Sequence, residues 1–346
     1  MSNQPPIEVP QGAIRLNTDS QRLEFFAQDR WYEMATDTPN LGDSPVGVRG
    51  LFFGEFDDSS NTPTIDYVTI SSQGNATDYG DLITVQFYGG VNSSHRRWIY
   101  FGGAPNNPTN QMQYGEISST GNGVDFGNLT ESTHYNPSGV GNRTRGVRMG
   151  GSVDPSGGAQ NTMDFWTYES TGNAVDFGDL VAAKRFAYSA NSPTRGMIAG
   201  GGFTNPTIGE NIIQYITIAT TGNAETFGDM SSDNVFSGGN GVCSNATRAL
   251  FGGGGPSYKT TVSTVQMATT GNSYDFGDLT VARNYSGSTA SATRAVWGGG
   301  YYTSPASYVN VIDYMSIATG GTAVDFGDRT VAGSYVSGCS NGHGGL

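Results

Sequence analysis

The chain repeats one short motif six times, an aromatic residue and a glycine followed by aspartate or asparagine. In order along the chain the six copies are Tyr79-Gly80-Asp81, Phe126-Gly127-Asn128, Phe177-Gly178-Asp179, Phe227-Gly228-Asp229, Phe276-Gly277-Asp278 and Phe326-Gly327-Asp328. Their glycines are 47, 51, 50, 49 and 50 residues apart. Such a constant spacing indicates repeated supersecondary units, each too small to bury its own apolar face.

An arginine begins an apolar stretch in each unit. Two residues after it stands an aliphatic residue or methionine, and five residues after it stands a glycine. The six arginines are Arg49, Arg97, Arg145, Arg195, Arg248 and Arg294. A short apolar run that ends at glycine is typical of a buried strand followed by a tight change of direction.

The rest of each unit predicts three more strands. After a variable polar stretch comes a strand with one apolar face, such as 211–219, and then a turn such as Thr221-Gly222-Asn223. Glycine and asparagine tolerate the positive φ angles that hairpin turns require. The strand with the aromatic motif follows, and a last segment such as 279–288 leads to the next arginine. Four strands per unit predict one blade of a β-propeller.

The unit resembles a kelch repeat. The resemblance rests on glycine doublets such as Gly102-Gly103, an aromatic residue on the third strand such as Tyr114, an aromatic residue on the fourth strand, and the arginine. Gly54-Glu55 and Thr264 depart from the pattern, and the fourth strand carries Phe or Tyr where kelch repeats usually have Trp. The resemblance implies an all-β fold over 46–346, a six-bladed propeller of four-stranded blades.

One blade is expected to be completed by both ends of this region. The repeat opens with an arginine strand at 46, whereas the strand that should precede such an arginine comes at 334–340. We therefore expect 334–340 and 48–82 to form one blade, which removes open sheet edges and closes the ring. Five or seven blades would need a miscounted unit.

Residues 1–45 differ in sequence and are predicted to form a separate β-module with a linker. Three short strands, 13–18, 23–28 and 31–34, are predicted to form a small β-meander, which is marginally stable alone and should dock onto something. The candidate docking residues are Ile14, Leu16, Leu23, Phe25 and Trp31. The segment resembles a short β-element of phage virion fibre and appendage proteins, and the Thr-Gly-Asn-Ala-x-Asp-Phe-Gly-Asp-Leu type of repeat resembles phage structural proteins. A flap packed on the same propeller is the alternative.

Composition and charge restrict the possible partners. The chain has 17 basic and 30 acidic residues and a net charge of −13, which disfavours binding to nucleic acid. No apolar stretch is long enough to span a membrane and no signal peptide is evident, so we expect a soluble protein made in a cytoplasm. Cys243 and Cys339 occupy similar places in different units and are expected to be free, buried thiols.

No catalytic or metal site emerges from residue spacing, and no cofactor is expected. The copper oxidases among kelch-type propellers use two histidines and two tyrosines, but His95, His134 and His343 lie in different repeats. Sialidase chemistry needs an arginine triad, whereas one arginine per unit suggests a structural task, such as bonding loop carbonyls or the Gly-Asp carboxylate. One aspartate per unit does not make a calcium site, and a role in turn capping is favoured.

The sequence favours a non-enzymatic structural protein of a phage virion, part of a tail or capsid appendage. Residues 1–45 would attach it to other virion proteins, and variable loops would contact a host glycan or surface protein. A homo-oligomer located in the virion, made in the host cytoplasm, is expected. The alternative is a carbohydrate-binding or carbohydrate-active kelch-type propeller of cellular origin.

Overall fold

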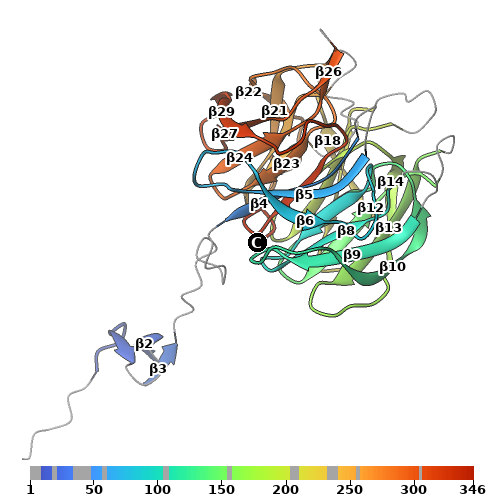
Figure 1. Ribbon diagram of the computed structural model, residues 1–346. Helices are drawn as coiled ribbons and strands as arrows, with labels where there is room; N and C mark the ends of the chain where they lie inside the picture. The colour runs from blue at the N-terminus through green and yellow to red at the C-terminus, as the bar shows by residue number, and fades with distance from the viewer. Residues whose placement is uncertain are drawn as a thin grey trace, which may run out of the picture. The chain divides into compact units, whose positions relative to one another are not determined.

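The computed structural model describes residues 9–17, 22–33, 48–56, 61–103, 109–153, 158–202, 210–231, 241–254, 258–303 and 306–346. Every regular secondary-structure element within these residues is a β-strand, so the predicted all-β fold is confirmed (Figure 1). The chain divides into two compact units, Met1–Gly42 and Asp43–Leu346. The variable stretches predicted at 55–63, 104–111, 152–161, 203–210, 255–261 and 301–307 lie partly or largely outside the described residues.

Six antiparallel sheets in the described part of Asp43–Leu346 share one strand order. We number them along the chain and call their strands first to fourth in hydrogen-bonded order. Sheet 1 is β30 (Ser337–Ser340), β4 (Arg49–Phe56), β5 (Asn61–Thr69) and β6 (Thr77–Asp81). Sheet 2 is β7 (Gly90–Ser93), β8 (Arg97–Phe101), β9 (Thr109–Glu116) and β10 (Val124–Thr133). Sheet 3 is β11 (Ser138–Gly141), β12 (Arg145–Met149), β13 (Gln160–Thr167) and β14 (Val175–Lys184).

The remaining sheets follow the same pattern. Sheet 4 is β15 (Tyr188–Asn191), β16 (Arg195–Ala199), β17 (Ile212–Thr217) and β18 (Glu225–Asp229). Sheet 5 is β19 (Val242–Ser244), β20 (Arg248–Gly252), β21 (Thr261–Gln266) and β22 (Tyr274–Asp278), with β28 (Gly321–Thr322) added parallel to β22. Sheet 6 is β23 (Gly287–Ala290), β24 (Arg294–Gly298), β27 (Val311–Ser316) and β29 (Val324–Asp328). A hairpin of β25 (Tyr301–Thr303) and β26 (Ala306–Tyr308) precedes β27.

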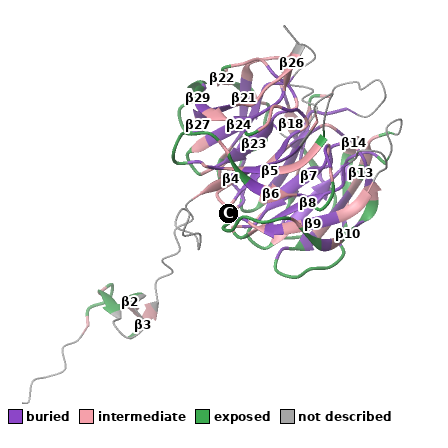
Figure 2. Ribbon diagram, in the orientation of Figure 1, coloured by how far each residue is buried: buried purple, intermediate pink, exposed green. Residues whose placement is uncertain are grey.

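Hydrophobic side chains pack between neighbouring sheets. Tyr188 of sheet 4 and Phe251 of sheet 5 belong to one buried cluster, and Phe52 of sheet 1 and Val296 of sheet 6 belong to another. Each of the six clusters among the described residues joins two consecutive sheets, and the series returns from sheet 6 to sheet 1. The first strands of consecutive sheets also contact one another. For example, β7 of sheet 2 lies beside β11 of sheet 3 and β30 of sheet 1. The arrangement is consistent with a propeller-like fold, with buried residues concentrated in its strands (Figure 2).

The aromatic residue of the repeated motif sits in a β-bulge in every sheet. In sheet 3, Asp176 pairs with Asp164 and Gly178 with Met163, which leaves Phe177 between them without a partner in the ladder. The same shift of register occurs in the other five sheets. A bulge turns the extra residue out of the regular alternation. Five of the six aromatic side chains are buried and Phe276 of sheet 5 is partly buried, each packed in an inter-sheet cluster.

The strand expected to complete the first blade is present. β30 pairs with β4 in an antiparallel register that joins Ser337 to Phe53 and Ser340 to Gly50. The residue after β30 continues this contact, since the backbone amide of Arg49 on β4 donates a hydrogen bond to the Asn341 side chain at 2.8 Å. Sheet 1 therefore combines the first and the last strands of Asp43–Leu346.

Met1–Gly42 contains the predicted three-stranded meander. β1 (Ile14–Asn17), β2 (Arg22–Ala27) and β3 (Arg30–Glu33) are antiparallel neighbours in that order. The second turn is a two-residue hairpin loop in which Gln28 and Asp29 have φ angles of 49° and 60°. Two consecutive positive φ angles match the twist of a tight hairpin. Residues 18–21, between β1 and β2, lie outside the described residues.

Candidate functional site

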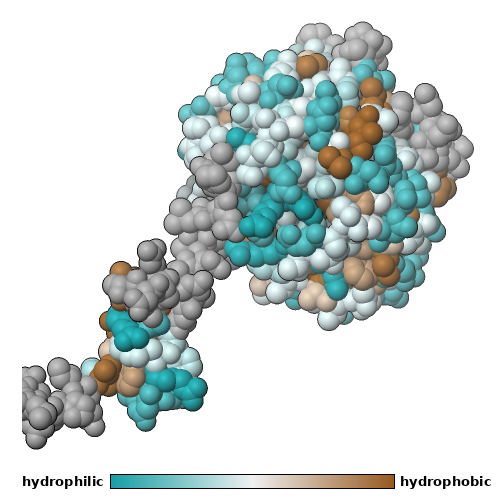
Figure 3. All heavy atoms as spheres, turned by 60° about the horizontal axis from the view of Figure 1, so that its bottom comes forward, coloured by the Kyte–Doolittle hydropathy of each residue, from teal (hydrophilic) through white to brown (hydrophobic). Residues whose placement is uncertain are grey.

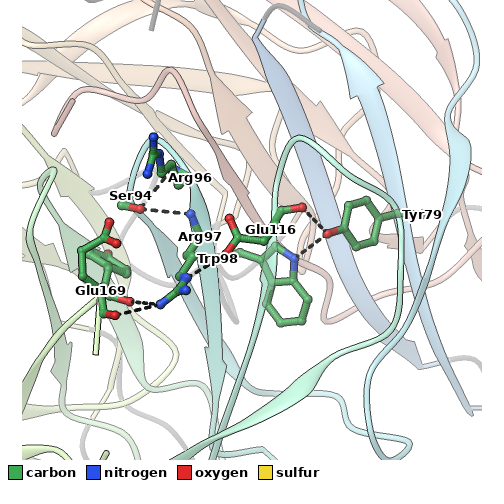
Figure 4. Close-up of polar contacts among 8 residues, drawn as sticks. Tyr79, Ser94, Arg96, Arg97, Trp98, Glu116 and Glu169 are labelled. Atoms are coloured by element: carbon green, nitrogen blue, oxygen red, sulfur yellow. Dashed lines mark hydrogen bonds and ion pairs between the residues drawn. The ribbon is translucent and has the colours of Figure 1, made fainter. Parts of the chain in front are cut away.

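The repeat arginines bond backbone carbonyls of the next sheet. Nη1 of Arg97 in sheet 2 donates to the carbonyl oxygens of Tyr168 and Glu169 in sheet 3, at 2.9 and 3.1 Å (Figure 4). Arg294 of sheet 6 donates to the carbonyl of Ile70 in sheet 1 at 2.9 Å. The corresponding bonds of the other sheets come from Arg49, Arg145, Arg195 and Arg248. Carbonyls were one of the two kinds of partner expected from the sequence, and these guanidinium groups are engaged in contacts between sheets.

Each of these arginines also lies over an aromatic ring. Arg195 is 4.7 Å from the ring centre of Tyr215 on the third strand of its own sheet. Arg248 instead lies over Phe276, because the third-strand position of sheet 5 is Thr264. The Thr264 hydroxyl donates to the carbonyl of Ala249. The departure from the repeat at Thr264 therefore moves the cation–π contact to the bulge residue.

The aromatic-Gly-Asp motif of one sheet bonds the Gly-Asn turn of the next. Gly121 N donates to the carbonyl of Tyr79 at 2.9 Å and Gly123 N to that of Asp81 at 2.8 Å. Asp81 N in turn donates to the side chain of Asn122 at 3.1 Å. Asparagine therefore provides the cap at this contact, a role that the sequence suggested for the aspartate. The bonds to the aromatic carbonyl recur between sheets 2 and 3, 3 and 4, and 4 and 5.

The same contact joins sheet 6 to sheet 1. Gly74 N donates to the carbonyl of Phe326 at 2.9 Å, and Ala76 N donates to that of Asp328 at 2.7 Å. Asp328 N donates to the side chain of Asn75 at 3.1 Å. Between sheets 5 and 6 the degenerate turn forms β28 and pairs in parallel with β22. The repeated motif residues thus hold the sheets to one another through their backbones.

Three buried ion pairs, which the sequence did not suggest, each have their carboxylate on a third strand. Asp164 of β13 accepts from Nη2 of Arg148 at 2.7 Å, with both side chains at most 1 % exposed. Asp313 of β27 pairs with Arg283 at 2.7 Å. The third pair joins Asp66 of β5 to Arg329 at 3.2 Å. A sequence signal was available, because each carboxylate interrupts an apolar stretch of a strand, as in Ile65-Asp66-Tyr67.

The sulfur and imidazole groups do not form a reactive cluster in the described residues. Cys243 and Cys339 are free and buried, as predicted. Burial raises the pKa of both thiols, to about 12 for Cys339, so neither is a thiolate at neutral pH. Within the described ranges, no three His, Cys, Asp or Glu side chains come together to hold a metal ion.

Residues 341–346, the C-terminal segment, lie across the ends of several first strands. His343 Nε2 bonds the carbonyl of Ser93 in sheet 2 at 2.7 Å, and its Nδ1 faces the amide group of Asn191 in sheet 4. A Cβ atom at Gly345 would lie 1.9 Å from the carbonyl oxygen of Gly141 in sheet 3. The approach of this segment to the strands therefore requires glycine.

A small cavity lies between the C-terminal segment and the first strands. Its volume is about 40 Å³, and its lining includes Asn92, Ser288, Thr289 and His343. The Oδ1 atom of Asn92 is buried and has no hydrogen-bond partner within the described residues. A volume of this size has room for a few water molecules, at about 10–15 Å³ each.

The stability of this segment is expected to depend on pH. With Nε2–H donating to Ser93, Nδ1 accepts from Asn191 and from Gly345 N at 3.0 Å, an arrangement that suits the neutral ring. Burial lowers the pKa of His343 to about 4, below its value of about 6.5 in an unfolded chain. The contribution of neutral His343 is therefore complete above pH 6.5 and is lost as the pH falls towards 4. Through this one group, the free energy of unfolding changes by at most about 1.4 kcal/mol per pH unit.

Urea unfolding at a series of pH values between 4 and 7 checks this expectation. The difference in unfolding free energy between the natural protein and His343→Gln should shrink as the pH falls, because glutamine does not titrate. Parallel curves for the two proteins would contradict it.

One face of the N-terminal sheet carries exposed apolar side chains. Ile14 is 64 % exposed and Leu16 59 %, and they pair across the ladder with Phe25 and Leu23, which are also exposed. Trp31 does not join them, because it pairs with Phe26 on the opposite face and lies under Arg15. Four of the five candidate docking residues therefore share a face. We call Ile14, Leu16, Leu23 and Phe25 the apolar face.

No protein-family model matches the chain, and no curated protein matches it. The described residues contain no helix that could cross a membrane. Figure 3 shows hydrophobic residues on one face of Asp43–Leu346 as separate patches among hydrophilic ones.

Proposed function

We propose that Asp43–Leu346 is a closed, six-bladed β-propeller in which sheets 1 to 6 are the blades. Three independent series of contacts support closure: the arginine bonds, the bonds between motif and turn, and the buried clusters. Each series includes a link from sheet 6 to sheet 1, made by Arg294, by Phe326 and Asp328, and by Val296 with Phe52. A closed ring leaves no sheet at the end of the series without a neighbour.

We propose that the protein is a non-enzymatic structural protein of a phage virion, located in a tail or capsid appendage. The observation that carries this proposal is the apolar face of the N-terminal sheet, because large exposed aliphatic side chains on a three-stranded sheet need a partner surface. The resemblance to phage fibre elements covers the same residues. The repeat arginines and motif backbones are engaged between sheets, which favours a structural role over a catalytic one.

The proposed partners follow from this arrangement. Other virion proteins bind residues 1–45 and cover the apolar face, and copies of the chain assemble in the particle. The propeller exposes its variable loops to a host glycan or surface protein. The protein is made in the host cytoplasm and is located in the virion.

Replacing both Ile14 and Leu16 with glutamate tests the anchor. Burying an aliphatic side chain stabilises a contact by about 1.5–3 kcal/mol, and a loss of 1.4 kcal/mol weakens binding tenfold. We therefore expect at least about a tenfold lower copy number in purified particles, measured by quantitative mass spectrometry of virions assembled with each variant. Val181→Glu is the matched control, since Val181 on β14 is 58 % exposed but lies outside the N-terminal sheet. Normal incorporation of the double variant would rule out the anchor.

A further inference from the structure

Aromatic side chains gather where the first strands begin. Tyr88, Phe186, Tyr285 and Tyr335 each stand two residues before a first strand, in sheets 2, 4, 6 and 1. The C-terminal segment instead contacts the far ends of first strands, at residues such as Ser93. The two features therefore lie at opposite ends of the first strands. We call these four residues, with Tyr135 of sheet 3, the aromatic collar.

The collar is continuous. The ring of Tyr335 is 4.1 Å from that of Tyr88 and 4.1 Å from that of Tyr285, measured between centres. Tyr135 is 4.7 Å from Tyr88 and 5.3 Å from Phe186. All five side chains are partly exposed. The rings thus form one surface contributed by five of the six sheets, and the corresponding residue of sheet 5 lies outside the described residues.

The backbone of the collar adopts a conformation that bulky residues avoid. The φ angles of Tyr88, Phe186, Tyr285 and Tyr335 are 63°, 54°, 58° and 58°, in the left-handed region. Glycine would adopt this conformation without strain, yet four sheets place an aromatic ring there. Strain of this kind is concentrated at sites with a function, where it holds a side chain in a useful position.

The collar lies at the end of the sheets where the second strands stop, which is where the variable stretches of the sequence begin. Each second strand runs antiparallel to the first, so it ends where the first strand begins, as in the pairing of Gly90 with Phe101 and of Tyr188 with Ala199. The stretches that follow the second strands therefore leave from the side of the collar. Recognition by a propeller is typically located on such a face.

We propose that the aromatic collar binds a neutral saccharide, an inference that rests on the proposed contact with a host surface. Flat rings suit the CH face of a sugar, and phenol hydroxyls can both donate to and accept from sugar hydroxyls. Burial raises the pKa of the Tyr88, Tyr285 and Tyr335 hydroxyls, and Tyr335 shares side-chain hydrogen bonds with Tyr88 and Tyr285.

The charge of the surroundings favours a neutral ligand. The collar itself contains no charged side chain, and its basic neighbours Arg185 and His134 are buried. The whole chain carries a net charge of −13, which repels anionic sugars such as sialosides.

Calorimetric titration of the full chain with cellohexaose, maltohexaose and laminarihexaose tests the proposal, with sialyllactose as the anionic comparison. At least one neutral hexaose should bind, and Tyr335→Gly should weaken that binding at least about tenfold. Glycine removes the ring and also relieves the positive φ, so the variant should fold. Tyr274→Ala is the matched control, because Tyr274 on β22 is 48 % exposed and outside the collar.

Each outcome decides the matter. Absence of binding by all three hexaoses up to about 10 mM, or equal binding by Tyr335→Gly, would overturn the proposal. If Tyr335→Gly does not fold, Tyr88→Gly takes its place, with the same tenfold weakening expected. Collar-dependent binding of a host protein without saccharide binding would also overturn it. Incorporation of the protein into particles is measured separately, so the anchor can stand when the saccharide site fails.

Discussion

Replacing Asp313 with alanine is expected to lower the free energy of unfolding by about 3–5 kcal/mol. Asp313 and Arg283 are both fully buried, and the carboxylate also accepts a hydrogen bond from the hydroxyl of Thr280. Burial lowers the pKa of Arg283, and the charge of Asp313 offsets part of that shift. Without the carboxylate, the guanidinium would remain in the protein interior with its charge uncompensated. Urea unfolding followed by tryptophan fluorescence measures the change.

Two variants show whether the effect comes from the unpaired charge. Asp325→Ala removes an exposed carboxylate from the next strand of the same sheet and should change stability by less than about 0.5 kcal/mol. Arg283→Met combined with Asp313→Leu removes both charges and should recover most of the loss. A stability for Asp313→Ala within about 1 kcal/mol of the natural protein would show that the pair contributes little.

Replacing Gly327 with alanine is expected to cost at least about 2 kcal/mol more than replacing Gly74 with alanine. Both glycines lie at the contact between sheets 6 and 1, and their φ angles are nearly equal, at 149° and 152°. A Cβ atom at Gly327 would lie 2.5 Å from the carbonyl oxygen of Gly74, whereas a Cβ atom at Gly74 would have nothing within 4 Å. The cost of placing alanine at a positive φ angle is therefore similar for the two variants. They differ in the clash of the added methyl group with the neighbouring sheet.

This pair of variants tests the closure of the ring directly. The extra cost of Gly327→Ala arises only if the fourth strand of sheet 6 lies against the turn of sheet 1. Thermal and urea unfolding of both variants measure it. Equal stabilities would mean that these two sheets do not meet as closely as the backbone bonds between them require.

The sequence predicted the repeated unit well because each of its features is local. Spacing, the Gly-Asn turn and the apolar alternation all act within about 50 residues, and each sheet repeats them. The pairing of β30 with β4 was also predictable, because one unit lacked a strand at its start and one strand remained at the end. The bulge at each aromatic residue was missed, although it breaks the alternation of buried and exposed positions, so that Phe177 and Leu180, three residues apart on β14, are both buried.

Contacts between units were harder to predict than the units themselves. The arginine motif indicated a structural role, but its carbonyl partners lie on the next sheet, about 70 residues away for Arg97 and Tyr168. The register of β1 with β2 places Ile14, Leu16, Leu23 and Phe25 on one face, and the register of β3 separates Trp31 from them, and neither register could be read from the sequence. The aromatic collar was missed, since a tyrosine in a loop shows neither its φ angle nor its neighbours.

The position of β30 has a consequence for synthesis. β4 leaves the ribosome almost 300 residues before the strand that pairs with it, as the 292-residue separation of Arg49 and Asn341 shows. Until then its edge is unpaired and open to wrong partners, including β4 of a neighbouring nascent chain. Pairing over so long a separation is also slow. The yield of native protein should therefore depend on how well the edge of β4 is protected during translation. A chaperone, or a wide spacing of nascent chains, would provide that protection.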